Sequence, residues 1–98
     1  MRHQAATVHE LARVAELSVL PGETLTELAR EMERHELGPG EELDTGEQVA
    51  VVLSGLVNGP TGVLHPGDRA SGLVRALTPS AVASCAREEY ERALARAG

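Results

Sequence analysis

The sequence predicts an α+β fold, in which a small β-roll, a jelly-roll-like open barrel, is flanked by two N-terminal helices and one C-terminal helix. Two observations predict it. Near both ends of the chain, apolar residues recur at the spacing of amphipathic helices. Between residues 35 and 85, short apolar runs alternate with Gly and Pro, which is typical of short strands joined by tight turns. We expect one domain over residues 1–98, because the chain contains no internal repeat and no low-complexity tract.

The first helix is predicted within "TVHELARVAEL", residues 7–17, and the second within "LPGETLTELAREMER", residues 20–34. Their apolar faces follow the i, i+3, i+4, i+7 spacing of a buried helix face. The first face would comprise Val8, Leu11, Ala12 and Ala15, and the second Leu25, Leu28, Ala29 and Met32.

The start of the second helix carries its own signal. Thr24 and Glu27 have the spacing of a capping box, and Pro21 just before them suits the first turn of a helix. The helix is therefore expected to begin near Thr24.

The strongest strand is predicted at "QVAVVLSGLV", residues 48–57, which is almost continuously apolar and rich in valine. Such a strand is typically central or buried on both faces. Asn58-Gly59 then predicts a hairpin turn into "VLHPGD", residues 63–68. Two further strands are expected in "LVRAL", residues 73–77, and "SAVASCA", residues 80–86.

The last helix is predicted from residue 87 onward, where small and apolar residues return to helical spacing. Its face would comprise Ala86, Tyr90, Ala93, Leu94 and Ala97. Tyr90 is the single aromatic residue of the chain, so the core is expected to be aliphatic.

Composition excludes several classes of partner. The formal net charge is −6, which argues against nucleic acid and against an anionic membrane, because both attract clustered cations. The single cysteine, Cys85, allows neither an internal disulfide nor a thiolate metal cluster. The N-terminus has no apolar segment of signal-peptide length, so a cytoplasmic location is expected.

The order of these features resembles the cyclic nucleotide-binding domain, the sensor β-roll of the catabolite activator family, over about residues 8–97. Residues 11–47 are similar to the two first helices and first strands of that family, with turns at Gly40-Glu41 and Gly46-Glu47. "VVLSGLV" matches its central strand with a glycine, here Gly55, and "LHPGD" matches the turn before its phosphate-binding cassette. "VRALTPSAVASCAREEYERAL" is similar to its last strands and the following helix.

The cassette itself departs from the family pattern. There, the resemblance implies Phe-Gly-Glu, a short helix whose N–H groups hold the phosphate, and an arginine that pairs with it. Here Gly67-Asp68 is present, Gly72 stands for the cassette glycine, and Leu73 occupies the position of the glutamate. Arg75 aligns with the strand after the cassette, so the cassette is interpreted as deleted. No segment corresponds to the dimerising helix or the DNA-reading helices of the transcription factors.

The remaining residues capable of catalysis or metal binding fit ordinary structural roles better. Cys85 falls in an apolar strand, where cysteine acts as a small hydrophobe. A cupin-type metal site would need several His and a carboxylate, whereas the strand region holds only His35 and His65, far apart. No serine stands in a hydrolase motif. We therefore expect no catalytic residue, no metal and no cofactor.

These observations favour a stand-alone, non-enzymatic module that has lost nucleotide binding and acts through protein contacts in a regulatory, adaptor or assembly role, or as a homodimer. The alternative is a sensor that binds a different anionic ligand, or a cyclic nucleotide weakly, at the shortened loop. Its binding residues would be Gly67, Asp68, Arg69, Ser71, Gly72 and Arg75. A cupin-type metal protein is a third alternative.

Overall fold

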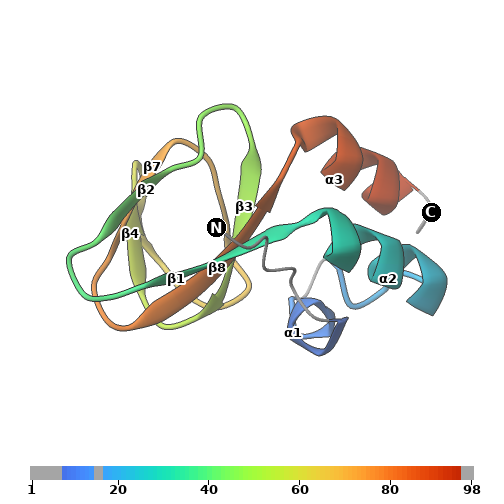
Figure 1. Cartoon of the computed structure of the whole chain (residues 1–98), viewed down its shortest axis with the longest axis horizontal. Helices are drawn as coiled ribbons and strands as arrows, with labels where there is room; N and C mark the ends of the chain where they lie inside the picture. The colour runs from blue at the N-terminus through green and yellow to red at the C-terminus, as the bar shows by residue number, and fades with distance from the viewer. Residues whose placement is uncertain (1–7, 15–16, 96–98) are drawn as a thin grey trace.

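The computed structural model describes residues 8–14 and 17–95 (Figure 1). It confirms the predicted α+β class: two four-stranded antiparallel sheets form an open roll that does not close into a barrel. The three helices of the described residues gather at one end of this roll (Figure 1). The helical layer therefore covers the sheet that contains β1, β3, β6 and β8, while the outer face of the sheet that contains β2, β4, β5 and β7 is not covered by the described helices.

The first predicted helix is shorter than expected. Helix α1 spans Val8–Ala12 and gives way to a series of turns with i to i−3 hydrogen bonds, in which Val14 N–H donates to Leu11 and Leu17 N–H to Val14. A period of three places Leu11, Val14, Leu17 and Leu20 on one buried line. Ala12, predicted on the buried face, is exposed for this reason. Ala15 and the side chain of Val8 lie outside the described residues.

Helix α2 spans Gly22–Glu31 and buries Leu25, Leu28 and Ala29 as predicted, with Met32 buried just beyond its end. The predicted capping box is wrong. The helix begins two residues before Thr24, at an N-cap Pro21 without a side-chain cap, and Thr24 is itself buried in the first turn.

The first sheet has the order β1-β8-β3-β6, comprising β1 Glu33–Leu37, β8 Ser80–Cys85, β3 Val49–Ser54 and β6 Arg69–Ala70. The second has the order β2-β7-β4-β5, comprising β2 Glu42–Asp44, β7 Leu73–Ala76, β4 Val57–Gly59 and β5 Gly62–Leu64. The register pairs Val51 with Ala83 in the first sheet and Leu43 with Val74 in the second.

The predicted strand over residues 48–57 is two strands in different sheets. It breaks at Gly55, whose φ of 82° lies in the left-handed region, and the chain crosses there from β3 to β4. The hairpin from β4 to β5 is confirmed, but Asn58 and Gly59 belong to β4 and the turn lies at Pro60 and Thr61.

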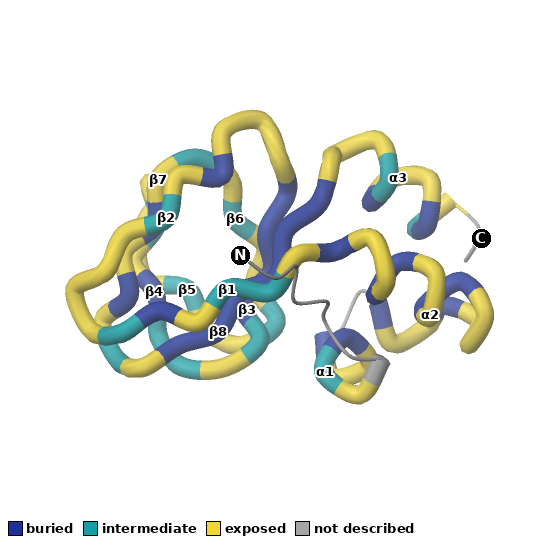
Figure 2. The backbone as a smooth tube through the Cα atoms, viewed as in Figure 1, coloured by how far each residue is buried: buried dark blue, intermediate teal, exposed yellow. Residues whose placement is uncertain are grey.

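Helix α3 spans Arg87–Ala95, with Tyr90 and Ala93 buried and Leu94 half-buried. The predicted Ala86 precedes the helix and is exposed, and the predicted Ala97 lies outside the described residues. Figure 2 shows burial concentrated along β3 and β8, where the roll meets the helices. These two strands divide the interior into two apolar clusters. One joins the helices to Val49, Val51 and Ala83, and the other fills the roll around Val52, Val57, Val74 and Val82.

Candidate ligand hollow at the shortened loop

The link between β6 and β7 consists of two residues, Ser71 and Gly72. Gly72 has a φ of 87°, and its N–H donates to Thr45 Oγ1 over 2.7 Å, while its carbonyl accepts from the Thr45 N–H over 2.9 Å. Both backbone groups of Gly72 are thus satisfied by a buried threonine of the turn before β3. Leu73 is 52% exposed and stands opposite Asp44 on the second sheet.

Gly67 and Asp68 form a tight turn before β6. Asp68 Oδ2 accepts from the His65 N–H over 2.7 Å, and the Asp68 N–H donates to the His65 carbonyl over 2.9 Å. Gly67, with a φ of 98°, donates its N–H to Val52 over 2.8 Å and fixes the turn to β3. The carboxylate of Asp68 therefore closes the turn.

Arg69 and Ser71 line a hollow of about 390 Å³ together with Arg87 from the start of α3. The other lining residues are Val49, Pro60, Thr61, Leu64 and Ala70. The guanidinium of Arg69 lies over the Tyr90 ring, 5.4 Å from its centroid, so a cation–π contact orients this side chain. The hollow thus combines two cations and two hydroxyl groups with an apolar wall.

Arg75 lies away from this hollow. It stands opposite Glu42 and Asn58 on the face of the second sheet that points out of the roll, whereas its neighbours Val74 and Ala76 point into the roll core. Of the six residues predicted for the alternative site, the structure brings only Arg69 and Ser71 together in one hollow. Arg87 was missed, because nothing in its sequence context distinguishes it from a solvated helix residue.

The cysteine and histidine candidates for catalysis or metal binding lie in surroundings that give them structural roles. Cys85 is buried in β8, and desolvation, followed by the charges of Glu89 and Glu31, raises the pKa of its thiol to about 11. His35 Nε2 lies 3.3 Å from Ser84 Oγ. Among residues 8–14 and 17–95, no group of three or more His, Cys, Asp or Glu side chains is placed to hold a metal ion. The residues that the structure describes also include no helix long and apolar enough to cross a membrane.

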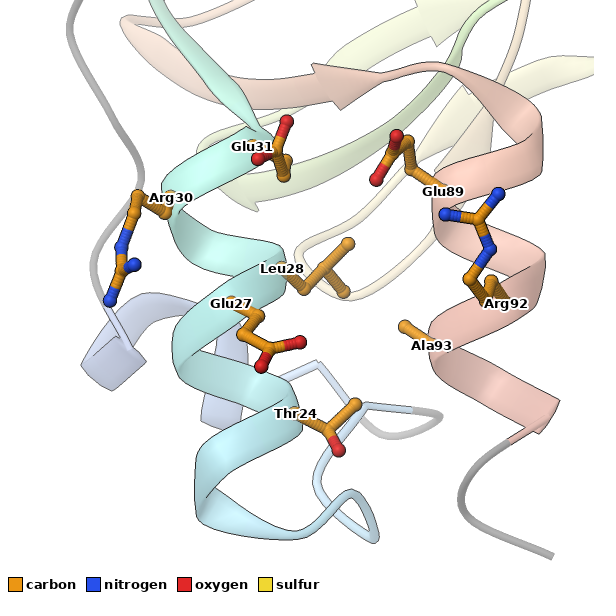
Figure 3. Close-up of a pocket in the computed structure, with 8 residues that line it drawn as sticks. All are labelled: Thr24, Glu27, Leu28, Arg30, Glu31, Glu89, Arg92 and Ala93. Carbon is orange, nitrogen blue, oxygen red and sulfur yellow. The ribbon is translucent and has the colours of Figure 1, made fainter.

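A second hollow, of about 280 Å³, lies between α2 and α3 (Figure 3). Its floor is formed by Leu28 and Ala93, and Glu31 of α2 and Glu89 of α3 extend toward each other across one end (Figure 3). Arg30 points away from the hollow. Three glutamates and two arginines line this hollow, and nothing in its geometry defines a ligand.

No protein-family model matches the sequence, and no curated protein matches it. Solved structures do match its fold. The regulatory subunit of a cAMP-independent protein kinase A from Trypanosoma brucei superposes with a TM-score of 0.72 at 23% identity, over 92% of this chain and 41% of that one. The sensor domain of the transcriptional regulator DNR from Pseudomonas aeruginosa gives a TM-score of 0.68 at 17% identity, over 89% and 75%.

A cyclic nucleotide-binding-like protein from Brucella abortus gives a TM-score of 0.60 at 20% identity, over 90% of this chain and 97% of that one. The chain therefore has the fold of cyclic nucleotide-binding domains, in a shortened form, as the sequence resemblance predicted. It spans only 41% of the kinase subunit's length.

Proposed function

We propose that this protein is a non-enzymatic, cytoplasmic module that does not bind cyclic nucleotides and acts through contacts with another protein or a second copy. The observation that carries the proposal is the two-residue link between β6 and β7. A phosphate site of the family type needs free N–H groups at a helix start, a carboxylate for the ribose and an arginine for the phosphate.

None of these three groups is supplied in the family's way here. The N–H of Gly72 is bonded to Thr45, the glutamate position holds Leu73, and Arg75 points out of the roll from the second sheet. A cyclic nucleotide placed in the roll would therefore lose the groups that offset the cost of desolvating its phosphate.

Calorimetry and thermal unfolding with cAMP and cGMP test this step. A ligand that binds only the folded state stabilises it by RT ln(1 + [L]/Kd), so a functional site would raise the unfolding midpoint clearly. We expect no heat of binding and no change in the midpoint at millimolar nucleotide. A saturable shift with either nucleotide would overturn the proposal.

The interaction role is supported by the position of exposed apolar side chains. Val63, Leu73 and Leu77 are 50%, 52% and 46% exposed, and all three lie in or beside the second sheet, which none of the described helices covers. Sedimentation at tens-of-micromolar concentration tests the self-association half. A mass of one chain under these conditions would leave a different protein as the partner, to be sought by co-purification from the native cell.

A second candidate function is a sensor for a small anion other than a cyclic nucleotide. The specific observation that favours it is the hollow that Arg69, Ser71 and Arg87 line. In this hollow, side chains would bind the anion in place of the backbone N–H groups of the missing phosphate-binding cassette.

A further inference from the structure

We infer that the hollow beside β6 is a binding site for a small organic anion, in which Arg69 and Arg87 hold a carboxylate or phosphate head and the apolar wall holds a compact hydrocarbon body. This inference rests on the second candidate function and names its ligand class. The residues come from five segments: β3, the β4–β5 hairpin, β6, the β6–β7 link and α3.

The charge of the hollow is opposite to that of the protein. The chain has 15 Asp and Glu residues against nine Arg, yet the hollow is lined by two arginines and by no carboxylate. Arg87 forms no ion pair with any other described residue. It also borders a neighbouring depression that Glu47 and Glu88 line. Two guanidinium groups offer donors in the planar geometry that suits carboxylate and phosphate oxygens.

One of the donors, Arg69, has a fixed neighbour before a ligand arrives. Arg69 lies over Tyr90, whose ring is fully buried among the helices, so its guanidinium has a fixed neighbour. Ser71 and Thr61 add hydroxyl groups that can donate to an anionic oxygen. The contact with Tyr90 orders the Arg69 side chain in advance, which lowers the entropy that binding must offset.

The apolar wall of the hollow determines which hydrocarbon body the ligand can have. Leu64 and Ala70 pack against the roll core and also line the hollow, beside Val49 and Pro60. A volume of about 390 Å³ lies at the lower end of the range of about 300–1,000 Å³ found for ligand sites. The volume and the lining therefore fit a small organic ligand with one anionic head and an apolar body.

Four probes separate the contributions of head and body. Isovalerate and isobutyl phosphate share an isobutyl body and differ in the head, isovaleramide keeps the body without the charge, and acetate keeps the charge without the body. Titrations of ¹⁵N-labelled protein at constant ionic strength should show saturable shifts at Arg69, Ser71 and Arg87 with either or both isobutyl anions. The tyrosine near-ultraviolet signal should change with them, because Tyr90 is the single aromatic residue and contacts Arg69.

The relative affinities decide the ligand class. Isovaleramide should not bind in the same range, and acetate should bind more weakly than isovalerate. Equal binding of isovaleramide would remove the anionic head from the inference, and equal binding of acetate would remove the apolar body. The absence of saturable binding by both isobutyl anions overturns the inference as a whole.

Variants locate the site. Arg69→Gln and Arg87→Gln should each weaken the better isobutyl anion about tenfold or more, as expected for loss of a charge-assisted hydrogen bond. Arg75→Gln is the matched control, because it removes the same charge from the outward face of the second sheet. If Arg75→Gln weakens binding equally, the effect is one of net charge and the site is refuted. Arg87 is exposed, so its variant tests the site even if Arg69→Gln disturbs the packing of α3.

The outcome is independent of the cyclic nucleotide experiment. Saturable binding of cAMP would overturn the proposed loss of nucleotide binding. If Arg69→Gln and Arg87→Gln leave that cAMP binding unchanged, the anion site in the hollow is still decided by the four probes alone. Failure of the isobutyl anions together with silent cAMP would remove the sensor function and leave the interaction module.

Discussion

Gly55 is the residue at which the chain leaves the first sheet for the second. Its φ of 82° is unfavourable for any residue with a Cβ, and a Cβ at this position would collide with the Pro79 carbonyl and with Ser80. The backbone of residues 79 and 80 is held in turn, because Ser80 Oγ donates to the Leu56 carbonyl over 3.1 Å. The crossing therefore has no room for a side chain.

We expect Gly55→Ala to lower the free energy of unfolding by about 3 kcal/mol, combining the cost of the left-handed conformation with that of overpacking. Gly46→Ala is the matched control, because Gly46 also has a positive φ of 60° but a Cβ there meets nothing within 4 Å. It should cost about 1 kcal/mol. Urea unfolding of both variants measures the difference, and equal losses would show that the collision at Gly55 is relieved.

Cys85 makes the stability of the protein depend on alkaline pH. Its thiol stays neutral in the folded chain up to a pKa of about 11, whereas it ionises near 9.0 in a solvated state. The stabilising contribution is therefore complete below pH 9 and is lost as the pH rises to about 11.

Over this interval the free energy of unfolding should fall by about 2 kcal/mol more in the wild type than in Cys85→Ala. Urea unfolding at intervals of one pH unit measures both slopes, and the comparison cancels the titration of the groups that both proteins share. Parallel slopes would mean that the thiol is solvated. Slow alkylation of the native protein at pH 8 provides a second check, because a neutral buried thiol is a poor nucleophile.

Among the elements, α1 is fixed to the roll by charge as well as by apolar packing. Arg34 of β1 donates to both oxygens of Glu10 over 3.2 and 3.0 Å, and to Glu36 over 2.9 Å. The Arg34 and Glu10 side chains are 17% and 27% exposed, whereas Glu36 is 70% exposed. The hydrogen bond to Glu36, outweighing desolvation, and those to Glu10 raise the pKa of Arg34, so the arginine is charged at every pH at which the protein folds.

Glu10→Gln should destabilise the protein by about 1 kcal/mol, because it removes a two-oxygen partner from a half-buried arginine. Glu36→Gln removes an exposed partner of the same arginine and should cost no more than about 0.5 kcal/mol. Thermal unfolding at low and at 1 M salt measures both, and the Glu10 effect should persist at high salt better than the Glu36 effect. No loss of stability in Glu10→Gln would show that α1 is held by packing alone.

The two N-terminal helices, the central region of strands and the C-terminal helix could be predicted from the sequence, but the ends of the elements could not, and the reasons are local. The helical spacing of Leu25, Leu28 and Ala29 marked α2, whereas its first residue depended on Pro21 and a buried Thr24 rather than on a cap. The apolar run over residues 48–57 gave no sign of a change of sheet, because both halves are buried. Only Gly55 marked the break.

The site was less accessible to sequence reasoning than the fold. The short spacing between Gly67 and Arg75 predicted that no helix lies between them, because too few residues remain to form one. Which arginines share a hollow depends on strand faces. Arg69 and Arg75 are close in sequence, yet they lie on different sheets, and Arg87 joins Arg69 only because β8 returns the chain to the start of α3.

At the scale of the whole molecule, β3 and β8 join two apolar clusters that lie on opposite faces of one sheet. Val51 belongs to the helical cluster, which includes Tyr90, and its neighbour Val52 belongs to the roll cluster. Both side chains are essentially fully buried, at 0% and 1% exposure. Since residues of the same two strands, β3 and β8, contribute to both apolar clusters, unfolding of one cluster should also destabilise the strands that form the other.

We therefore expect a single cooperative unfolding transition, in which Val51→Ala and Val52→Ala each cost about 2 kcal/mol and shift all signals together. The helical signal at 222 nm and the near-ultraviolet signal of Tyr90 both report on the helical cluster. Val52→Ala, which changes only the roll cluster, is the decisive variant. If it leaves the Tyr90 and helical transitions in place while amides of β4 and β7 become exchangeable, the roll and the helical layer are separate folding units. If all transitions shift by the same amount, a disturbance in the roll core reaches α3 through β3 and β8.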